Sequence, residues 1–228
     1  MKDISLKDLL EAGCHFGHQS NRWHPKAAKY IYTERDGVHI IDLVKTREGL
    51  LAAGEYLYDL AKKGGTVIFV ATKRQAKPIA QELINKVNES FGDQYSGFHH
   101  LLERWPGGML TNFEVLSKNF QKMGALLDQA ASPTLTKKER LLAKREHDKL
   151  GKFYDGVKSL AKLPDAIFLV DPKRELGCVK EASVTGVKIV GICDTNCNPD
   201  PINYPIPAND DAVGSIKIIM SYLNQFIN

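Results

Sequence analysis

The sequence predicts an α/β protein: a three-layer α/β/α sandwich around a parallel sheet, with an antiparallel coiled-coil helical hairpin inserted into it. Three continuous apolar runs, each followed by a helix candidate, predict the sheet. A long segment between the first two runs has apolar residues at steps of three and four, which predicts the hairpin. At 228 residues, the chain is long enough for one large domain that carries such an insertion.

The three apolar runs have the pattern of strands that are buried on both faces. They are TVIFVATK at 66–73, DAIFLVDP at 165–172 and VKIVGICD at 187–194. The helix candidates that follow them cover 75–90, 174–185 and 210–224. Strands that alternate with helices form a parallel sheet with right-handed crossovers, so we expect these strands to share one sheet.

The N-terminal part of the chain is predicted to contain two helices, a loop and a hairpin. Ser5 can cap a short helix that ends at Gly13. The stretch EAGCHFGHQSNRWHP then continues as a loop, and YIYTERDGVHIID reads as two strands that turn around Asp36. A helix that starts at Asp42 or Thr46 is expected to stop at the glycines 64 and 65.

We expect 112–163 to form the inserted arm, and 1–111 with 164–228 to form the α/β body. The apolar seams of the arm are Phe113, Leu116, Phe120, Met123, Leu127 and Ala130, then Leu150, Phe153, Val157 and Leu160. Ser132 to Thr134 interrupt the pattern, and Thr136 with Glu139 offers a capping box for a second helix. A first helix of about 20 residues would be roughly 30 Å long.

Positive charge is concentrated between Ser117 and Leu163. This segment holds eleven Lys and Arg against five acidic residues, a net charge of +6 in a chain whose total is +4. A cationic segment on an otherwise slightly acidic protein is typical of a nucleic-acid-binding surface. A solvated helical face with scattered lysines is the alternative.

The composition, with 43% hydrophobic and 25% charged residues, is that of a globular protein and excludes a disordered chain. The N-terminus carries Asp3 and Asp8 and resembles neither a secretory signal nor a transit peptide. No apolar run approaches the roughly 20 residues that a membrane-spanning helix needs. We therefore expect a protein of the cytoplasm, or one made inside an organelle.

A metal site is the first hypothesis for the cysteines and histidines. In a chain without an export signal, the four cysteines are expected to be reduced thiols. Cys193 and Cys197 form a C-x3-C pair, but no second pair nearby completes a four-ligand zinc set. A zinc ion shared between this pair and Cys14, His15 and His18 stays an alternative, while our expectation is no metal and no cofactor.

The ends of the predicted strands allow an enzymatic alternative, a nucleotide- or phosphate-binding α/β enzyme. Asp171 and Asp194 would hold Mg²⁺ while nearby basic residues received phosphate. Against this, no G-x-G-x-x-G follows the first buried strand, and the chain has no G-x-x-x-x-G-K-[ST], G-x-S-x-G or H-E-x-x-H motif. Aspartates more commonly cap loops and helix starts. We expect no enzyme and no catalytic residue.

The stretch RWPGGMLTNF combines a cation, an aromatic ring and two glycines. Gly107 and Gly108 let the backbone approach a partner closely, while Arg104 and Trp105 offer charge and a stacking face. Thr111 or Asn112 can cap the first arm helix, whose N-terminus favours an anion. A plain turn with a buried Trp is the alternative.

Eight stretches, in order, resemble the ribosomal protein S2 family in its bacterial and organellar form. They are EAGCHFGHQSNRWHPK, GVHIIDLVKT, FVATKRQA, RWPGGMLTNF, LTKKERL, LPDAIFLVDP, DTNCNPD and YPIPANDDA, and they extend to about Ile219. The resemblance implies a flavodoxin-like, Rossmann-like body with a coiled-coil arm and no catalytic activity. It implies a protein that binds small-subunit ribosomal RNA and lies on the solvent side of the small subunit, near the junction of the head and the body of that particle. Neighbouring ribosomal proteins are implied partners, and in bacteria the family also helps to dock the mRNA-binding ribosomal protein S1.

The resemblance places RNA contacts by region: in the N-terminal loop, after the first buried strand, in RWPGGMLTNF and along the arm. The expected contact residues are His15, His18, Gln19, Asn21, Arg22, Trp23, Lys26, Lys73, Arg74, Arg104, Trp105, Gly107, Gly108, Thr111, Asn112, Lys118, Lys137, Lys138 and Arg145. Their charges would meet phosphates, and their rings would stack or pack. For each histidine and for Trp23, a structural role in the loop is the alternative.

The chain departs from the family at several positions. Cys14 stands where the family usually has an aliphatic residue, and we expect it to be a small buried hydrophobe. His24 replaces Asn, and Pro106 replaces Leu. The segment that includes NESFGDQYSGFHH is longer than in the family, so we carry no contact over to His100.

Overall fold

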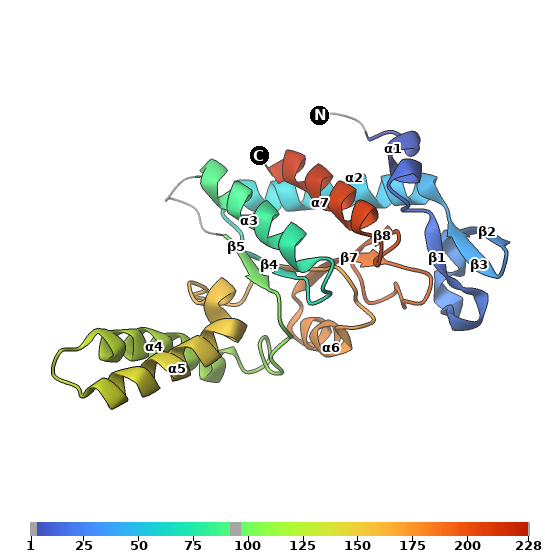
Figure 1. The fold of residues 1–228 in the computed structure, drawn as a ribbon. Helices are drawn as coiled ribbons and strands as arrows, with labels where there is room; N and C mark the ends of the chain where they lie inside the picture. Colours follow the sequence, from blue (N-terminus) through green and yellow to red (C-terminus); the bar gives the residue numbers. More distant parts are fainter. Residues whose placement is uncertain (1–3, 92–96, 228) are drawn as a thin grey trace.

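In the computed structural model, which describes residues 4–91 and 97–227, helices cover both faces of a five-stranded parallel sheet (Figure 1). The strand order is β5-β4-β6-β7-β8. The strands are β4 (Val67–Val70), β5 (Phe98–Leu101), β6 (Ala166–Leu169), β7 (Lys188–Cys193) and β8 (Tyr204–Pro207). Every neighbouring pair is parallel. The predicted fold class is confirmed, and the three predicted strands β4, β6 and β7 lie side by side.

Side chains that alternate along each central strand fill both faces of the sheet. In β4 and β6, Phe69 and Phe168 point to one hydrophobic cluster, while Ile68 and Ile167 point to the other. All four side chains have no exposed surface. This two-sided burial explains why the strands read as continuous apolar runs rather than as an alternating pattern.

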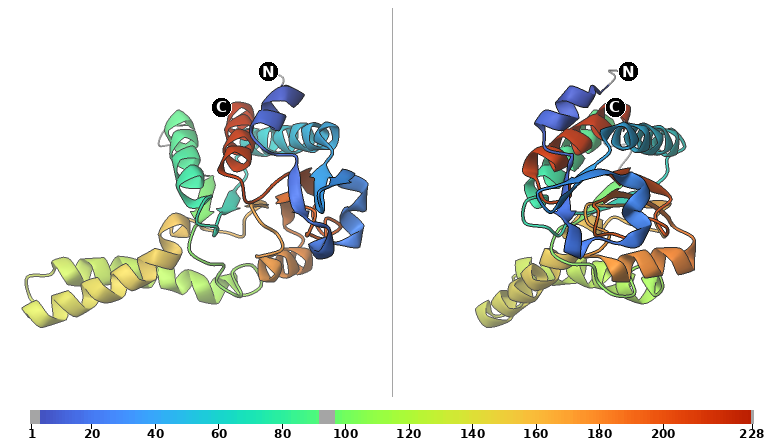
Figure 2. Two further views of the ribbon diagram at one scale, coloured as in Figure 1. Left: turned by 45° about the vertical axis from the view of Figure 1, so that its right-hand side comes forward. Right: turned by 90° about the vertical axis from the view of Figure 1, so that its right-hand side faces the viewer.

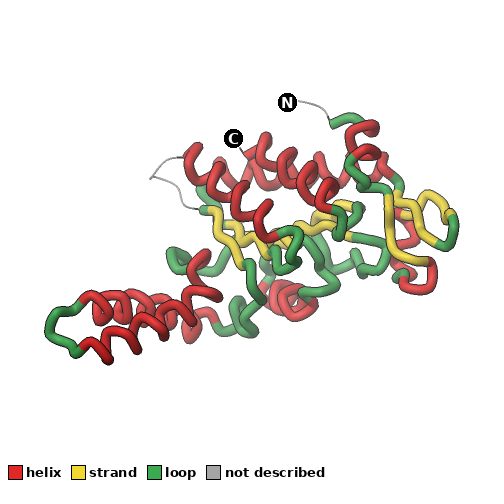
Figure 3. Tube along the Cα trace, in the orientation of Figure 1, coloured by secondary structure: helices red, strands yellow, loops and turns green. Residues whose placement is uncertain are grey.

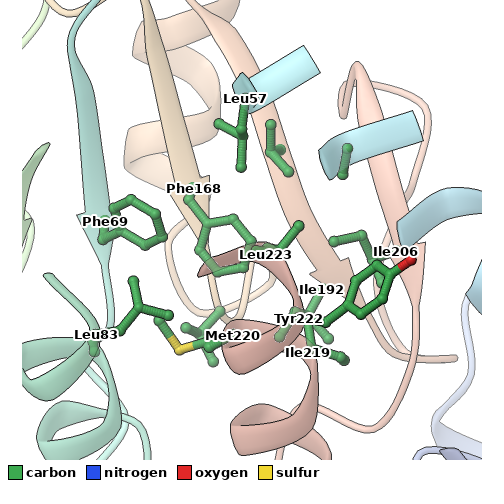
Figure 4. Close-up of a cluster of buried hydrophobic side chains, with 14 of the residues drawn as sticks. Leu57, Phe69, Leu83, Phe168, Ile192, Ile206, Ile219, Met220, Tyr222 and Leu223 are labelled. Atoms are coloured by element: carbon green, nitrogen blue, oxygen red, sulfur yellow. The ribbon is translucent and has the colours of Figure 1, made fainter. Parts of the chain in front are cut away.

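Three long helices pack on one face of the sheet and a shorter helix on the other. Helices α2 (Leu43–Lys62), α3 (Lys77–Phe91) and α7 (Val213–Ile227) enclose the larger cluster, in which Leu57 and Leu223 lie near Phe168 (Figure 4). Helix α6 (Leu176–Thr185) covers the opposite face. The helices predicted at 75–90, 174–185 and 210–224 are thus confirmed within a few residues. No described helix is both long enough and apolar enough to cross a membrane.

The N-terminal segment forms a separate small sheet beside the main one (Figure 3). Helix α1 (Leu6–Glu11) begins with a capping box at Ser5, as expected. The predicted hairpin consists of β2 (Ile31–Arg35) and β3 (Val38–Ile41), with Asp36 and Gly37 at positive φ in the turn. The expectation of a continuous loop before the hairpin was wrong, because β1 (Phe16–Gln19) pairs antiparallel with β3.

The segment predicted as an arm forms two helices, α4 (Phe113–Ala131) and α5 (Lys137–Tyr154), that lie side by side and project from the body (Figure 2). A short 3-10 helix, η4 (Asp155–Val157), returns the chain to the sheet. The predicted capping box of Thr136 and Glu139 is present at the start of α5. Asn112 stands at the N-cap of α4, but its side chain makes no capping hydrogen bond.

Two strands of the main sheet, β5 and β8, were not predicted. β8 contains two prolines, Pro205 and Pro207, and lies at the edge of the sheet, where missing N–H donors are tolerated. β5 is the other edge strand and lies in the segment that departs from the family, of which residues 92–96 are outside the described residues. η4 packs closely on β5, since a Cβ atom on Gly156 would lie 2.3 Å from the carbonyl oxygen of His100.

Phe168→Ala is expected to lower the free energy of unfolding by about 3–5 kcal/mol, because it leaves a cavity between the sheet and α7. Urea unfolding measured by circular dichroism tests this. Leu142→Ala is the control, since Leu142 is 53% exposed on α5, and its effect should stay within about 0.5 kcal/mol. Equal losses in the two variants would contradict the assignment of the core.

Candidate nucleic-acid interface

Residues 19–26 present polar and aromatic side chains to solvent next to the small sheet. Two 3-10 helices, η1 (Ser20–Arg22) and η2 (Pro25–Tyr30), shape this loop. Of the predicted contact residues, Gln19, Asn21, Arg22, Trp23 and Lys26 are exposed. Trp23 is 41% exposed, and its ring centroid lies 5.3 Å from that of His39 in an edge-on arrangement. The loop therefore offers both charge and a stacking face.

His18 attaches this loop to the end of β7. Its Nδ1 lies 3.1 Å from Asp194 Oδ1, and its backbone N–H donates to Thr195 Oγ1 at 2.9 Å. The hydrogen bond with Asp194 is the main cause that raises the pKa of His18, although burial works in the opposite direction. Gly17 permits the close approach, since a Cβ atom there would lie 2.7 Å from Thr195 Cγ2. His18 thus has an anchoring role inside the protein.

The other two histidines of the loop also face the protein. Nδ1 of His15 is buried and has no hydrogen-bond partner among the described residues, and burial lowers the pKa of this side chain. Nδ1 of His24 accepts a hydrogen bond from the backbone N–H of Lys26 at 3.2 Å. The Lys26 ammonium forms an ion pair with Asp200, which lowers the pKa of that carboxyl group. Cys14 is fully buried, as expected.

The ammonium group of Lys73 lies among three carboxylates. Its Nζ is 2.7 Å from Asp210 Oδ1, 2.8 Å from Asp211 Oδ1 and 3.0 Å from Asp171 Oδ2, and the side chain is only 10% exposed. Burial disfavours the charged form of Lys73, but the three carboxylates outweigh it and raise the pKa. Burial and the charges of Asp171 and Asp194 raise the pKa of Asp210 to about 7. Lys73 is therefore engaged with carboxylates of the protein, which leaves little of its charge for a phosphate.

The same cluster bears on the enzymatic and metal alternatives. Asp171 contacts the Lys73 ammonium, while Asp194 contacts His18, so neither is a free carboxylate at the sheet edge. His18, Asp194 and Asp210 each bring a ligand atom within 4.8 Å of the others, a geometry that can hold a metal ion. Within the described ranges this is the one such group of three, and it contains no cysteine. The zinc site shared with Cys193 and Cys197 is thus not assembled there.

A carboxylate from α6 lies against the loop before α4, residues 104–112, which we call the root loop. Glu181 accepts hydrogen bonds from Trp105 Nε1 at 2.9 Å and from the backbone N–H groups of Gly108 at 2.8 Å and Leu110 at 3.0 Å. Although burial acts against it, these bonds lower the pKa of Glu181. Gly108 has a φ of +85°, which glycine adopts without strain. The N–H groups expected to meet phosphate are therefore engaged with a protein carboxylate.

The remaining predicted residues of this stretch face outward. Arg104 is exposed, and its guanidinium carbon lies 4.5 Å from the ring centroid of Phe153 at the base of the arm. This cation–π contact fixes the stem of Arg104 without neutralising its charge. Gly107, Thr111 and Asn112 are also exposed. The root loop thus keeps one available cation next to a surface of small and polar side chains.

The arm carries cations that the protein does not neutralise. Lys118, Lys137, Lys138 and Arg145 are all exposed, and within the described part of the chain none of them forms an ion pair. In contrast, Lys122 is paired with Glu146 across the two helices at 2.5 Å. The capping box engages Glu139 and lowers its pKa. The acid nearest to Lys137 and Lys138 is therefore committed to the helix terminus.

Sequence reasoning missed the acidic residues that organise these surfaces. Asp210 and Asp211 follow β8, a strand that was itself not recognised. Glu181 lies in the middle of a predicted helix, where a carboxylate carries no local signal of its role. Only the fold brings it against the root loop, more than seventy positions away in the chain.

The fold and these surfaces define a structural α/β protein with a projecting basic arm. Comparison with known proteins agrees: the family model described as "Ribosomal protein S2" matches residues 9–228. The small ribosomal subunit protein uS2 of Coprothermobacter proteolyticus is 46% identical over 225 residues, covering 97% of this chain and 80% of the relative. The chain belongs to the ribosomal protein S2 family.

Membership of this family makes the chain a structural component of the small ribosomal subunit. The family consists of structural ribosomal proteins, so the alternative of a nucleotide-binding enzyme is set aside. The resemblance seen in the sequence is thereby confirmed over nearly the whole chain.

His18→Gln is expected to destabilise the protein more at pH 5.5 than at pH 8.5. Because the folded-state pKa of His18 is raised, its contribution is complete below the unfolded pKa and is lost as the pH rises through the folded pKa. Urea unfolding of both proteins at several pH values measures the difference. A difference that does not change with pH would show that His18 is not charged in this site.

Glu181→Gln is expected to lower the free energy of unfolding by about 1–3 kcal/mol. The amide NH₂ group of Gln would face N–H donors that bond to the carboxylate of Glu181 in the wild type. Limited proteolysis should also cut the root loop faster. Glu55→Gln, at an exposed position on α2, is the control and should change stability by less than about 0.5 kcal/mol. Wild-type stability and proteolysis in Glu181→Gln would refute the anchoring role.

Proposed function

We propose that this protein binds small-subunit ribosomal RNA through its arm and the adjacent loops, and that this contact holds it in the particle. The observation that carries the proposal is the set of exposed, unpaired cations on the arm: Lys118, Lys137, Lys138 and Arg145. Exposed lysines and arginines on a projecting helix pair reach phosphates without bending the body. Membership of the ribosomal protein S2 family supplies the RNA-containing environment.

The N-terminal loop and the root loop form the second part of the proposed interface. Arg22 and Arg104 contribute charge, and Trp23 contributes a partly exposed ring on which an unpaired base stacks. Gln19, Asn21, Lys26, Gly107, Thr111 and Asn112 complete the proposed contact surface. Such a combination contacts phosphates through its charged groups and single-stranded bases through its ring.

Several predicted contact residues have roles inside the protein, and we assign them to the support of this surface. Lys73 neutralises carboxylates, His18 is bonded to the end of β7, and the Nδ1 atom of His15 is buried. Trp105 and Gly108 donate to Glu181. These residues position the loops whose exposed neighbours meet the RNA.

Neighbouring ribosomal proteins are further proposed partners, including ribosomal protein S1 where the particle contains it. The exposed aromatic rings of Phe16 and Tyr32 on the small sheet support a protein contact, because aromatic residues are enriched in interfaces. We propose the cytoplasmic ribosome as the location, with an organellar ribosome as the second candidate.

Replacing Lys137, Lys138 and Arg145 by Glu is expected to weaken binding to a small-subunit rRNA transcript and to lower the slope of log K against log salt by about 2. The three side chains are exposed, so the fold should persist, as circular dichroism would verify. Filter binding between about 50 and 200 mM salt provides the measurement.

The control replaces three exposed lysines of the body, Lys63, Lys180 and Lys188, by Glu, which changes the net charge by the same amount. Its salt dependence should stay close to that of the wild type. Equal effects of the two triple variants would refute a specific role of the arm. A wild-type protein that leaves the RNA unbound at low salt would refute the proposed function as a whole.

A further inference from the structure

A polar cleft opens at the carboxyl ends of β4 and β6. It has a volume of about 610 Å³ and is lined by Thr72, Lys73, Arg74, Gln75, Lys77, Glu103, Arg174 and Asp211. The next strand in the chain, β5, lies on one side of β4, and β6 lies on the other side. The chain therefore changes direction across the sheet at β4. Ligands of open parallel sheets bind at such a point, outside the carboxyl ends of the strands.

Two of the four basic residues of this cleft keep their charge available. Lys73 is neutralised by its carboxylates, and Lys77 pairs with Glu103 at 2.8 Å. Arg74 is exposed and forms no ion pair within the described residues. Arg174 makes only a long ion pair, in which its Nε atom is 4.0 Å from Glu175 Oε1 and thus beyond hydrogen-bond distance, and its side chain is 56% exposed. Two arginines that follow different strands, Arg74 after β4 and Arg174 after β6, therefore line one cleft.

The cleft has a fixed frame, because Thr72 Oγ1 donates to Glu175 Oε1 at 2.5 Å and thus connects the end of β4 to the start of α6. In the part of the chain that the structure describes, its lining contains no aromatic ring and no aliphatic residue, so it offers no ring face on which a base could stack. Guanidinium groups instead match the paired oxygens of a phosphate, with two parallel N–H donors each. The chemistry favours a phosphate group over a nucleobase.

We propose that this cleft is a phosphate-binding site in which Arg74 and Arg174 hold one phosphate group between them. The ligand is a phosphodiester of the RNA backbone, an assignment that rests on the proposed function, or a free phosphate anion with the same chemistry. Arg174 was not among the RNA contacts expected from the family resemblance, although it follows a predicted strand among the basic residues of the enzymatic alternative. Lys73 contributes indirectly, since its single charge offsets part of the acidic charge of Asp210 and Asp211 at the cleft.

The test compares the wild type with Arg74→Gln/Arg174→Gln. Two probes are used: a small-subunit rRNA transcript in filter binding at several salt concentrations, and inorganic phosphate in calorimetric titration. For an RNA phosphate, the double variant should bind the transcript roughly ten-fold more weakly, with a slope of log K against log salt lower by about 1 to 2. Arg74→Lys/Arg174→Lys should recover part of this loss, because charge is kept while paired hydrogen bonding is not.

Lys63→Gln/Lys188→Gln is the matched control, which removes two exposed charges near the amino ends of the strands. An unchanged salt slope in Arg74→Gln/Arg174→Gln, together with wild-type phosphate binding that this variant loses, would identify free phosphate as the ligand. If the double variant behaves like the control with both probes, the site is refuted. A wild type that binds no RNA refutes the proposed function instead, while the phosphate titration still decides the cleft.

Discussion

The burial of the central strands on both faces is the constraint on which the rest of this structure depends. Because Ile68 and Phe69 point to opposite clusters, and Ile167 and Phe168 do the same, β4 and β6 leave no surface for polar groups along their length. Charged side chains then lie at the strand ends, on the outer faces of the helices and on segments that leave the body. The cleft lies at the strand ends, while the loops and the arm are segments that leave the sheet.

Charges in this protein fall into two groups with different energetic consequences. Lys73 and Asp210 are withdrawn from water, and Glu181 is partly buried among its N–H donors, so removal of one partner leaves the other uncompensated. Lys137, Lys138 and Arg145 stay hydrated, and their contribution to stability is small. The first group therefore fixes the geometry of the loops, whereas the second can serve binding without cost to the fold.

The sequence was sufficient for the elements that carry strong local patterns. The apolar runs of β4, β6 and β7, the two arm helices and the caps at Ser5 and Thr136 lie where periodicity and side-chain chemistry predicted them. The predicted seam was wrong at Leu127, which is 57% exposed while Leu126 is buried, and at Val157 and Leu160, which follow α5 and pack in the core of the body. The short strands β1, β5 and β8 were missed, because their four residues include glycine, histidine or proline and gain their stability from pairing. The internal roles of Lys73 and His18 could not be predicted either, since their partners come from distant parts of the chain.

The two arm helices join the body at one end, through the root loop, the first turns of α4 and η4, while the turn from Ser132 to Thr136 lies at the free end. The length of the arm can consequently change without any change in the sheet. A heptad added to each helix would extend the reach of the hairpin by about 10 Å and preserve the register of its seam. The protein can in this way be adapted to a wider or narrower gap between its neighbours while every residue of the body stays in place.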